Sequence, residues 1–142
     1  WGAAPGCIVA DSPGEIRRLY VARDRHGSGV ARDLMQACVA EMNKHFKARH
    51  DFFNAGLNAL PGFRVLPGAG TFYAFCDISG AIRNLGLADD HEFAEFLLDK
   101  AGVAGVPGTG FGAPGHIRFS FAVSHQTLEK ALERMGRALA GP

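Results

Sequence analysis

The sequence predicts an α+β protein in which helices pack on one face of a mainly antiparallel sheet. Apolar periodicity alternates between short β-type runs and longer helical stretches, in the order β-β-α-β-β-α-β-β-α. Turn segments rich in Gly and Pro bound the β-type runs. Neither a repeat nor a low-complexity linker divides residues 1–142, so we expect a single domain.

The N-terminal part predicts a β-hairpin. Residues 6–10 are a short apolar run, Asp-Ser-Pro-Gly at 11–14 is a turn signal, and residues 16–21 alternate as a strand. We expect four of its apolar side chains to be buried against the rest of the domain or against a second subunit. They are Ile8, Ile16, Leu19 and Val21.

A long helix is expected next. Its apolar spacing begins near Val30 and continues to about Leu60, where the pair Pro61–Gly62 ends it. Residues 30–55 contain neither Gly nor Pro, so the helix is predicted to pass Gln36 without a break.

The remaining elements follow in order. We expect strands at 63–66, 71–78, 103–106 and 117–123, and amphipathic helices at 89–101 and 124–139. Asp89 or Asp90 is the expected N-cap of the first of these helices, and Gly102 follows its end. Ser124 is the expected N-cap of the second.

Composition excludes several classes of protein. A hydrophobic share of 47% with 20% charged residues is typical of a globular chain. A net charge of +1 gives no large field of one sign, which excludes general binding to nucleic acid or anionic membranes. No apolar run approaches the roughly 20 residues that span a bilayer, and no secretory leader pattern begins the chain, so a cytoplasmic location is expected.

Cysteine and histidine spacing indicates neither a disulfide framework nor a metal site. The three cysteines, Cys7, Cys38 and Cys76, are scattered and form no Cys-x-x-Cys pair. The six histidines have no carboxylate or thiol partners at ligand spacing, so no metal is expected.

A Gly-rich turn precedes the long helix. Such a turn can bind an anion, because its backbone N–H groups lack partners and the helix dipole adds positive potential. Together with the preceding Leu-Tyr-Val, residues 15–35 resemble the strand, turn and helix with which GNAT acetyltransferases hold acetyl-CoA. The resemblance implies a phosphate turn made of His26, Gly27, Ser28, Gly29, Val30 and Ala31. The family prefers Arg or Gln where this chain has His26. Alternatively, the two glycines only let a strand turn tightly into a helix.

Residues 37–140 carry phrases of a second family. HFKARHDFFNAGLNALPGF at 45–63, PGAGTFYAFCDISG at 67–80, and FAEFLLDKAGVAGVPGTGFGAPGHIRFSFAVS at 93–124 resemble the C-terminal small domain of fold-type-I, pyridoxal-phosphate-dependent aminotransferases. The final helix phrase, LEKALERMGRAL at 128–139, fits the same pattern. The chain therefore resembles two families, with residues 1–36 acetyltransferase-like and residues 37–142 aminotransferase-like.

The second resemblance singles out Arg118. In the phrase Gly-x-x-Arg-x-Ser-Phe-Ala this arginine clamps the substrate α-carboxylate of the family, which a planar guanidinium can meet with two parallel hydrogen bonds. The resemblance also places Phe72 and Tyr73 at the substrate entrance and Gly108–Gly112 in a loop facing the active site. The alternative for Arg118 is a strand arginine that faces solvent or pairs with a local carboxylate such as Asp77.

The family's large-domain residues are absent from this sequence. The resemblance places four features outside these residues: the Schiff-base lysine, the aspartate that pairs with the pyridinium nitrogen, the aromatic that stacks on the ring and the phosphate-binding cluster. Lys44, Lys47, Lys100 and Lys130 match none of those positions and are expected on helix surfaces. No cofactor is therefore expected on this chain alone, although the two families use pyridoxal phosphate and acetyl-CoA.

Three functional interpretations follow. The first is a recombined or truncated folding module without catalysis of its own, in which the N-terminal segment covers the former domain interface, a role that homodimerisation could also fill. The second is a fragment of an aminotransferase that carries only the carboxylate-binding arginine. The third is a weak acetyl-CoA-binding remnant.

Overall fold

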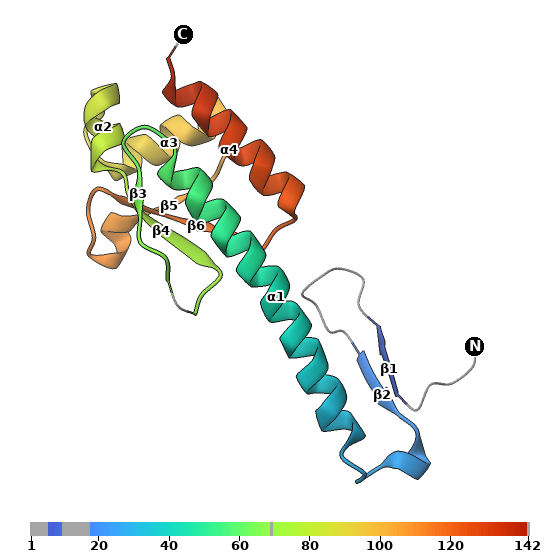
Figure 1. The fold of residues 1–142 in the computed structure, drawn as a ribbon. Coiled ribbons are helices and arrows are strands. Elements are labelled where there is room, and N and C mark those ends of the chain that lie inside the picture. The colour runs from blue at the N-terminus through green and yellow to red at the C-terminus, as the bar shows by residue number, and fades with distance from the viewer. Residues whose placement is uncertain (1–5, 10–17, 69, 142) are drawn as a thin grey trace. The chain divides into compact units, whose positions relative to one another are not determined.

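The computed structural model describes residues 6–9, 18–68 and 70–141 (Figure 1). The chain divides into two compact units, residues 1–48 and residues 49–142, which are described separately. The expectation of one domain over residues 1–142 stays a prediction.

The first unit contains two strands and most of a helix. Strands β1 (Gly6–Val9) and β2 (Arg18–Val21) pair in antiparallel register, with Gly6 opposite Val21. The expected burial of Ile8, Ile16 and Leu19 concerns side chains outside the described part of the chain, whereas Val21 is described and is only half-buried. A 3₁₀ turn, η1 (Arg23–Arg25), leads from β2 towards the long helix.

Helix α1 spans Val30–Asn58, so the prediction that it passes Gln36 without a break is confirmed. An uninterrupted run of helix-compatible residues explains its length. It ends before the Pro61–Gly62 pair, where Gly62 adopts the left-handed conformation with φ of +80°.

The second unit is built on a four-stranded sheet. The strands are β3 (Arg64–Val65), β4 (Tyr73–Asp77), β5 (Val106–Pro107) and β6 (His116–Ser120), in the order β3-β4-β6-β5. Every neighbouring pair is antiparallel, as predicted. The strands are shorter than expected, and the β5 pairing begins only at Val106, after the predicted run at 103–106 has nearly ended.

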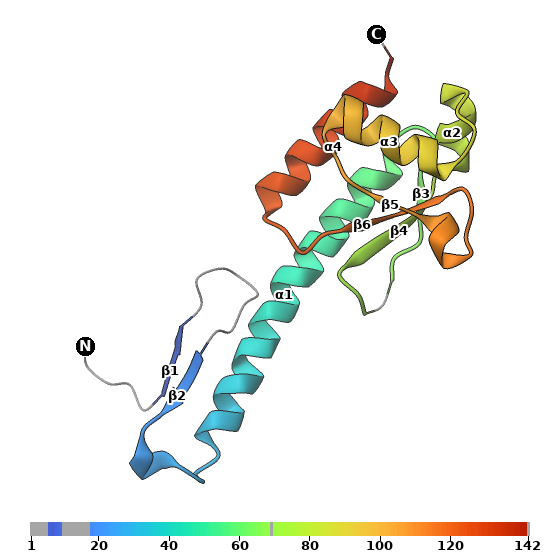
Figure 2. The same ribbon diagram turned by 180° about the vertical axis from the view of Figure 1, so that it is seen from behind.

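Helices cover one face of this sheet (Figure 2). They are the C-terminal part of α1, α2 (Ser79–Leu85), α3 (Asp90–Ala101) and α4 (His125–Leu139), with a 3₁₀ turn, η2 (Gly108–Phe111), before β6. Side chains alternate along β4 and β6, so that Ala74, Cys76, Ile117 and Phe119 are buried beneath the helices. The Phe53 ring of α1 contacts Phe119 edge to face at a centroid distance of 6.2 Å.

Local signals at the helix ends are largely confirmed. Asp89 is the N-cap of α3 and accepts hydrogen bonds from the backbone N–H groups of His91 and Glu92. Ser124 caps α4 by accepting from the Thr127 N–H. Gly102 ends α3 in the left-handed conformation, with φ of +62°. Helix α2 was not predicted, because seven residues that include a glycine are too short to show a clear helical period.

Two contacts fix the end of α1 to the rest of the second unit. The Asn58 side chain accepts from the Val65 N–H at 2.8 Å and donates to the Val65 carbonyl at 3.1 Å. The turn after α1 meets α2 so closely that a Cβ on Gly62 would overlap the backbone of Gly80 and Ala81. The Ala81 N–H donates to the Gly62 carbonyl across this contact.

None of the described helices is both long and apolar enough to cross a lipid bilayer.

Candidate carboxylate-binding site

The face of the sheet opposite the helices carries polar and aromatic side chains. In the β4–β6 register Phe75 lies opposite Arg118, and Asp77 lies opposite His116. These residues alternate with the buried ones, so they share the second face. Phe75 is 39% exposed although it is a large apolar residue. The open face therefore presents an aromatic surface with a cation at its centre.

Arg118 is the best-defined group on this face. Its guanidinium carbon lies 4.3 Å from the centroid of the Tyr73 ring and 4.6 Å from that of the Phe111 ring. Such contacts hold the planar group without using its N–H donors. The Nε atom of Arg118 is buried and has no hydrogen-bond partner. A buried donor without a partner is costly, and a ligand carboxylate would supply one.

The alternative pairing of Arg118 with Asp77 is not observed. No ion pair among the described residues includes Arg118. Asp77 instead accepts from the backbone N–H of Ser79 at 2.9 Å, at the start of α2. Hydrogen bonds from Ser79, and then the positive charges of His116 and Arg64, hold the pKa of the Asp77 carboxyl below its usual range.

The predicted entrance residues lie at the edge of this site. Tyr73 begins β4, and the Phe72 and Tyr73 rings lie 4.3 Å apart. The Phe72 carbonyl accepts from the Phe121 N–H at 2.9 Å, which extends the β4–β6 pairing by one bond. Both aromatics therefore belong to the segment that pairs with the strand of Arg118.

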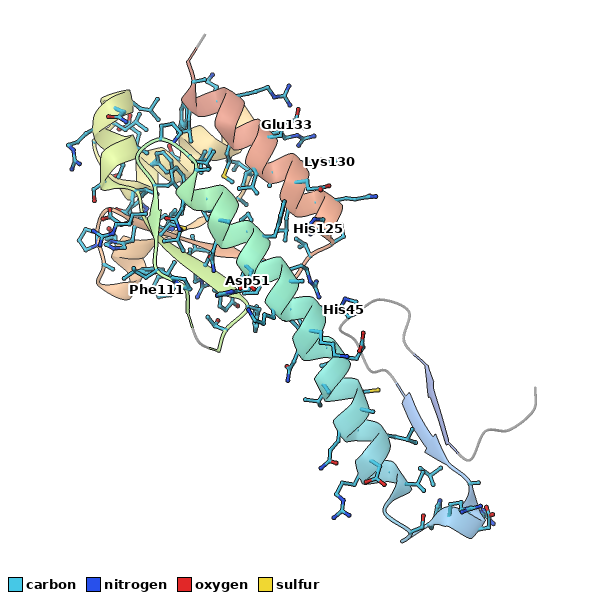
Figure 3. All side chains as sticks on the ribbon, in the orientation of Figure 1. His45, Asp51, Phe111, His125, Lys130 and Glu133 are labelled. Atoms are coloured by element: carbon cyan, nitrogen blue, oxygen red, sulfur yellow. The ribbon has the colours of Figure 1, made fainter. Side chains whose placement is uncertain are left out.

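The predicted loop at Gly108–Gly112 forms the turn η2 and its left-handed C-cap, Gly112. Phe111 projects from this turn beside the sheet (Figure 3) and is 52% exposed. Besides Arg118, its ring contacts Phe75 at a centroid distance of 6.5 Å. The turn thus brings a third aromatic ring to the open face.

Asp90, the first residue of α3, holds η2 in place. Its side chain is fully buried, and it accepts from both the backbone N–H and the hydroxyl of Thr109, each at 2.7 Å. Burial alone would raise the pKa of the Asp90 carboxyl, but hydrogen bonds, first of all those from Thr109, outweigh it and the pKa is lowered. From the sequence, Asp90 is recognisable only as a candidate N-cap, because a partner 19 residues away leaves no local signal.

The four lysines of the chain all lie on helices. Lys44, Lys47, Lys100 and Lys130 are exposed on helices α1, α3 and α4, as expected. Lys44 pairs with Glu41 at 3.1 Å and Lys100 with Asp99 at 2.8 Å. Figure 3 shows Lys130 on α4 and Phe111 on the opposite side of the second unit. The two lysines of the second unit, Lys100 and Lys130, thus lie on helices α3 and α4 and not on the sheet face that carries Arg118.

The Gly-rich turn at residues 26–31 lines a separate hollow. Gly27 and Gly29 have φ of +79° and +87°, which other residues rarely adopt. The Ser28 hydroxyl donates to the Arg25 carbonyl at 2.6 Å, and a His26 ring nitrogen lies 3.1 Å from the Val21 carbonyl. Both side chains thus hold the turn itself. The glycines permit the tight passage from β2 into α1.

Metal and thiol chemistry find little support in the described residues. No group of three or more His, Cys, Asp or Glu side chains there could hold a metal ion. Cys76 is fully buried in the core, and its burial raises the pKa of the thiol to about 12. It therefore behaves as an apolar core residue.

Comparisons with known proteins agree on one family. The family model of "Aminotransferase class I and II" matches residues 16–135. This match begins before the Gly-rich turn and runs through Gln36, so it crosses the expected junction between two resemblances. The comparisons give no support to the acetyltransferase resemblance or to a chimera.

Among curated proteins, the chain is 45% identical over 102 residues to the aspartate aminotransferase of Bacillus sp. strain YM-2, covering 72% of this chain and 26% of that protein. It is 37% identical over 111 residues to the aspartate/prephenate aminotransferase of Nitrosomonas europaea, covering 74% and 28%. The chain thus spans about a quarter of the length of these relatives.

Solved structures give the same result. A tetra mutant of Thermus thermophilus aspartate aminotransferase matches with a TM-score of 0.66 at 37% identity, over 81% of this chain and 29% of that one. The aromatic aminotransferase of Pyrococcus horikoshii matches with a TM-score of 0.65 at 36% identity, over 75% and 27%. With the family match spanning residues 16–135 and both kinds of relative in agreement, the chain belongs to the class I and II aminotransferase family, whose members use pyridoxal phosphate.

Proposed function

We propose that this chain is a small-domain part of a pyridoxal-phosphate-dependent aminotransferase that acts on amino acids of the aspartate or aromatic type. Arg118 binds the α-carboxylate of the substrate. The observation that carries the proposal is the Arg118 guanidinium, which lies on an open aromatic face with a buried Nε donor that has no partner. The names of the relatives support the reaction class and the substrate class.

The chain's own contribution is recognition and orientation. The rings of Tyr73 and Phe111 hold the guanidinium plane, and its N–H edge can meet both oxygens of a carboxylate. Pyridoxal phosphate supplies the electron sink in this family. None of the four lysines of this chain matches the family's Schiff-base position, so the proposal assigns that chemistry to the large domain of the family.

A titration with maleate, a dicarboxylate, tests the role of Arg118. The Nε–H resonance of Arg118 in ¹⁵N-labelled chain should shift on binding, and Arg118→Lys should weaken binding about tenfold or more, because one charge-assisted hydrogen bond is worth about 1.5–3 kcal/mol. Arg64→Lys is the matched control, since Arg64 is an exposed arginine on another strand of the same sheet. Equal binding by the Arg118→Lys and Arg64→Lys variants would contradict the proposal.

A second experiment tests whether any lysine of this chain binds pyridoxal phosphate. Incubation with pyridoxal phosphate and then borohydride should leave no stoichiometric adduct at one particular lysine, and the chain should not transaminate aspartate. Labelling of one lysine at full occupancy, with turnover, would show that the chain holds its own catalytic centre.

Acetyl-CoA binding is the second candidate function, favoured by one observation. Residues 25–29, with Val21, Ala31 and Arg32, line a hollow of about 710 Å³ at the start of α1. A lone phosphate cradle should bind no tighter than the millimolar range, equivalent to about 4 kcal/mol. Calorimetry with acetyl-CoA is the test, and a micromolar constant that Gly29→Asp abolishes would favour this function.

A further inference from the structure

The Phe111 side chain makes few contacts that could fix its position. Its ring is 52% exposed, and it belongs to a four-residue 3₁₀ turn between two short strands. Exposed aromatic rings gain little from burial, so their positions are set mainly by the backbone that carries them. Yet this ring lies 4.6 Å from the Arg118 guanidinium carbon. Something other than the ring must hold the turn.

The strongest contact of the turn is with Asp90. Both carboxylate oxygens are used: Oδ2 accepts from the Thr109 N–H and Oδ1 from the Thr109 hydroxyl, each at 2.7 Å. The carboxylate is fully buried although the neighbouring Asp89 already caps α3. Helix capping therefore does not explain why Asp90 is buried. Burial of a charged carboxylate is unfavourable, and the two hydrogen bonds from Thr109 offset that cost.

The turn is also closely packed on its other side. A Cβ on Gly108 would overlap the Ala113 carbonyl oxygen and would lie 2.7 Å from the His116 Cβ. The Ala113 N–H donates to the Gly108 carbonyl at 3.0 Å. With Gly108 fixed against β6 and Thr109 fixed to α3, the backbone that leads to Phe111 has little freedom left.

We propose that Asp90 is a positioning residue for the carboxylate site: through Thr109 it fixes turn η2 and so holds Phe111 against the Arg118 guanidinium. In this way α3, on the helix-covered side of the sheet, sets the geometry of the open side. The effect on ligand affinity rests on the proposed function of Arg118, whereas the effect on the ring contact does not.

The ligand-free test uses Thr109→Val and Thr109→Ser. Valine keeps the volume but removes the hydroxyl, whereas serine keeps both donors to Asp90. Thr109→Val should shift the Arg118 side-chain NMR resonances in the same direction as Phe111→Leu, because both weaken the ring-current effect of Phe111. Thr109→Ser should leave them in place. Unchanged Arg118 resonances in folded Thr109→Val protein would overturn the proposal, even if its thermal stability is lower.

The ligand test uses maleate and a double-mutant cycle. Thr109→Val should raise the dissociation constant about two- to fivefold, the size expected for one exposed cation–π contact. The same substitution should have no further effect in a Phe111→Leu background, since the ring it positions is gone. Additive effects of the two substitutions would overturn the proposal. If wild-type chain fails to bind maleate while the resonance shifts occur as expected, the proposed function fails and the positioning role stands.

Discussion

The close approach of Gly62 and α2 gives the sharpest prediction for stability. Gly62→Ala adds a methyl group at a φ of +80°, where it would overlap the backbone of Gly80 and Ala81. The left-handed conformation costs a non-glycine residue about 1 kcal/mol. Relief of the overlap requires a backbone shift that weakens the bond from the Ala81 N–H to the Gly62 carbonyl, for about 1–3 kcal/mol more.

Two further glycines separate these contributions. Gly86 also has positive φ, at +68°, but no atom lies within 4 Å of the position that a methyl group would take there. Gly80 has the overlap without positive φ, since its Cβ would lie 2.8 Å from the Gly62 Cα. Gly86→Ala should therefore cost about 1 kcal/mol. Gly80→Ala should cost about 1–2 kcal/mol after the better helix propensity of alanine is counted.

Thermal unfolding followed by circular dichroism measures all three variants. At about 3–4 °C per kcal/mol for a chain of this size, Gly62→Ala should lower Tm by about 10 °C and Gly86→Ala by about 3 °C. Urea midpoints should give the same order. Equal losses for Gly62→Ala and Gly86→Ala would refute the argument, because they would leave only the shared φ cost.

Two more predictions concern buried groups. The pKa of Asp90 is lowered in the folded state, so its contribution to stability is present above the ordinary aspartate pKa of about 3.9 and is lost as pH falls through the folded-state pKa. Asp90→Asn should therefore destabilise the chain at pH 7 by about 1–3 kcal/mol and flatten the acid limb of a plot of urea midpoint against pH. An unchanged acid limb would contradict this. Burial raises the pKa of the Cys76 thiol to about 12, so Cys76 should resist alkylation by iodoacetamide in native protein. In a Cys7→Ser variant, the half-exposed Cys38 should react instead. Equally fast labelling of Cys38 and Cys76 would contradict the burial of Cys76.

Much of the second unit could be predicted because its signals are local. Asp89, Gly102 and Ser124 act at helix ends, where the residue type itself satisfies the backbone or permits the required φ. Alternation along β4 and β6 predicted strands, and the resemblance placed Arg118 on one of them.

What could not be predicted depends on long-range partners. Nothing near Asp90 in the sequence points to Thr109, and the contacts of Arg118 with Tyr73 and Phe111 join three separate segments. The acetyltransferase resemblance shows the opposite difficulty. A Gly-rich turn before a helix is a common local solution, so residues 26–31 alone carry little information about family.

The double hydrogen bond between Asn58 and Val65 makes the last residue of α1 act as part of the sheet. An amide side chain has the same donor and acceptor as a peptide group, so here it imitates one more strand residue at the β3 edge. Rotation of this end of α1 about its own axis would pull directly on β3, and through the β3-β4-β6 ladder on the strand that carries Arg118. In the described part of the second unit, the end of α1 and the carboxylate site are thus connected by a series of hydrogen bonds, and not by apolar packing alone.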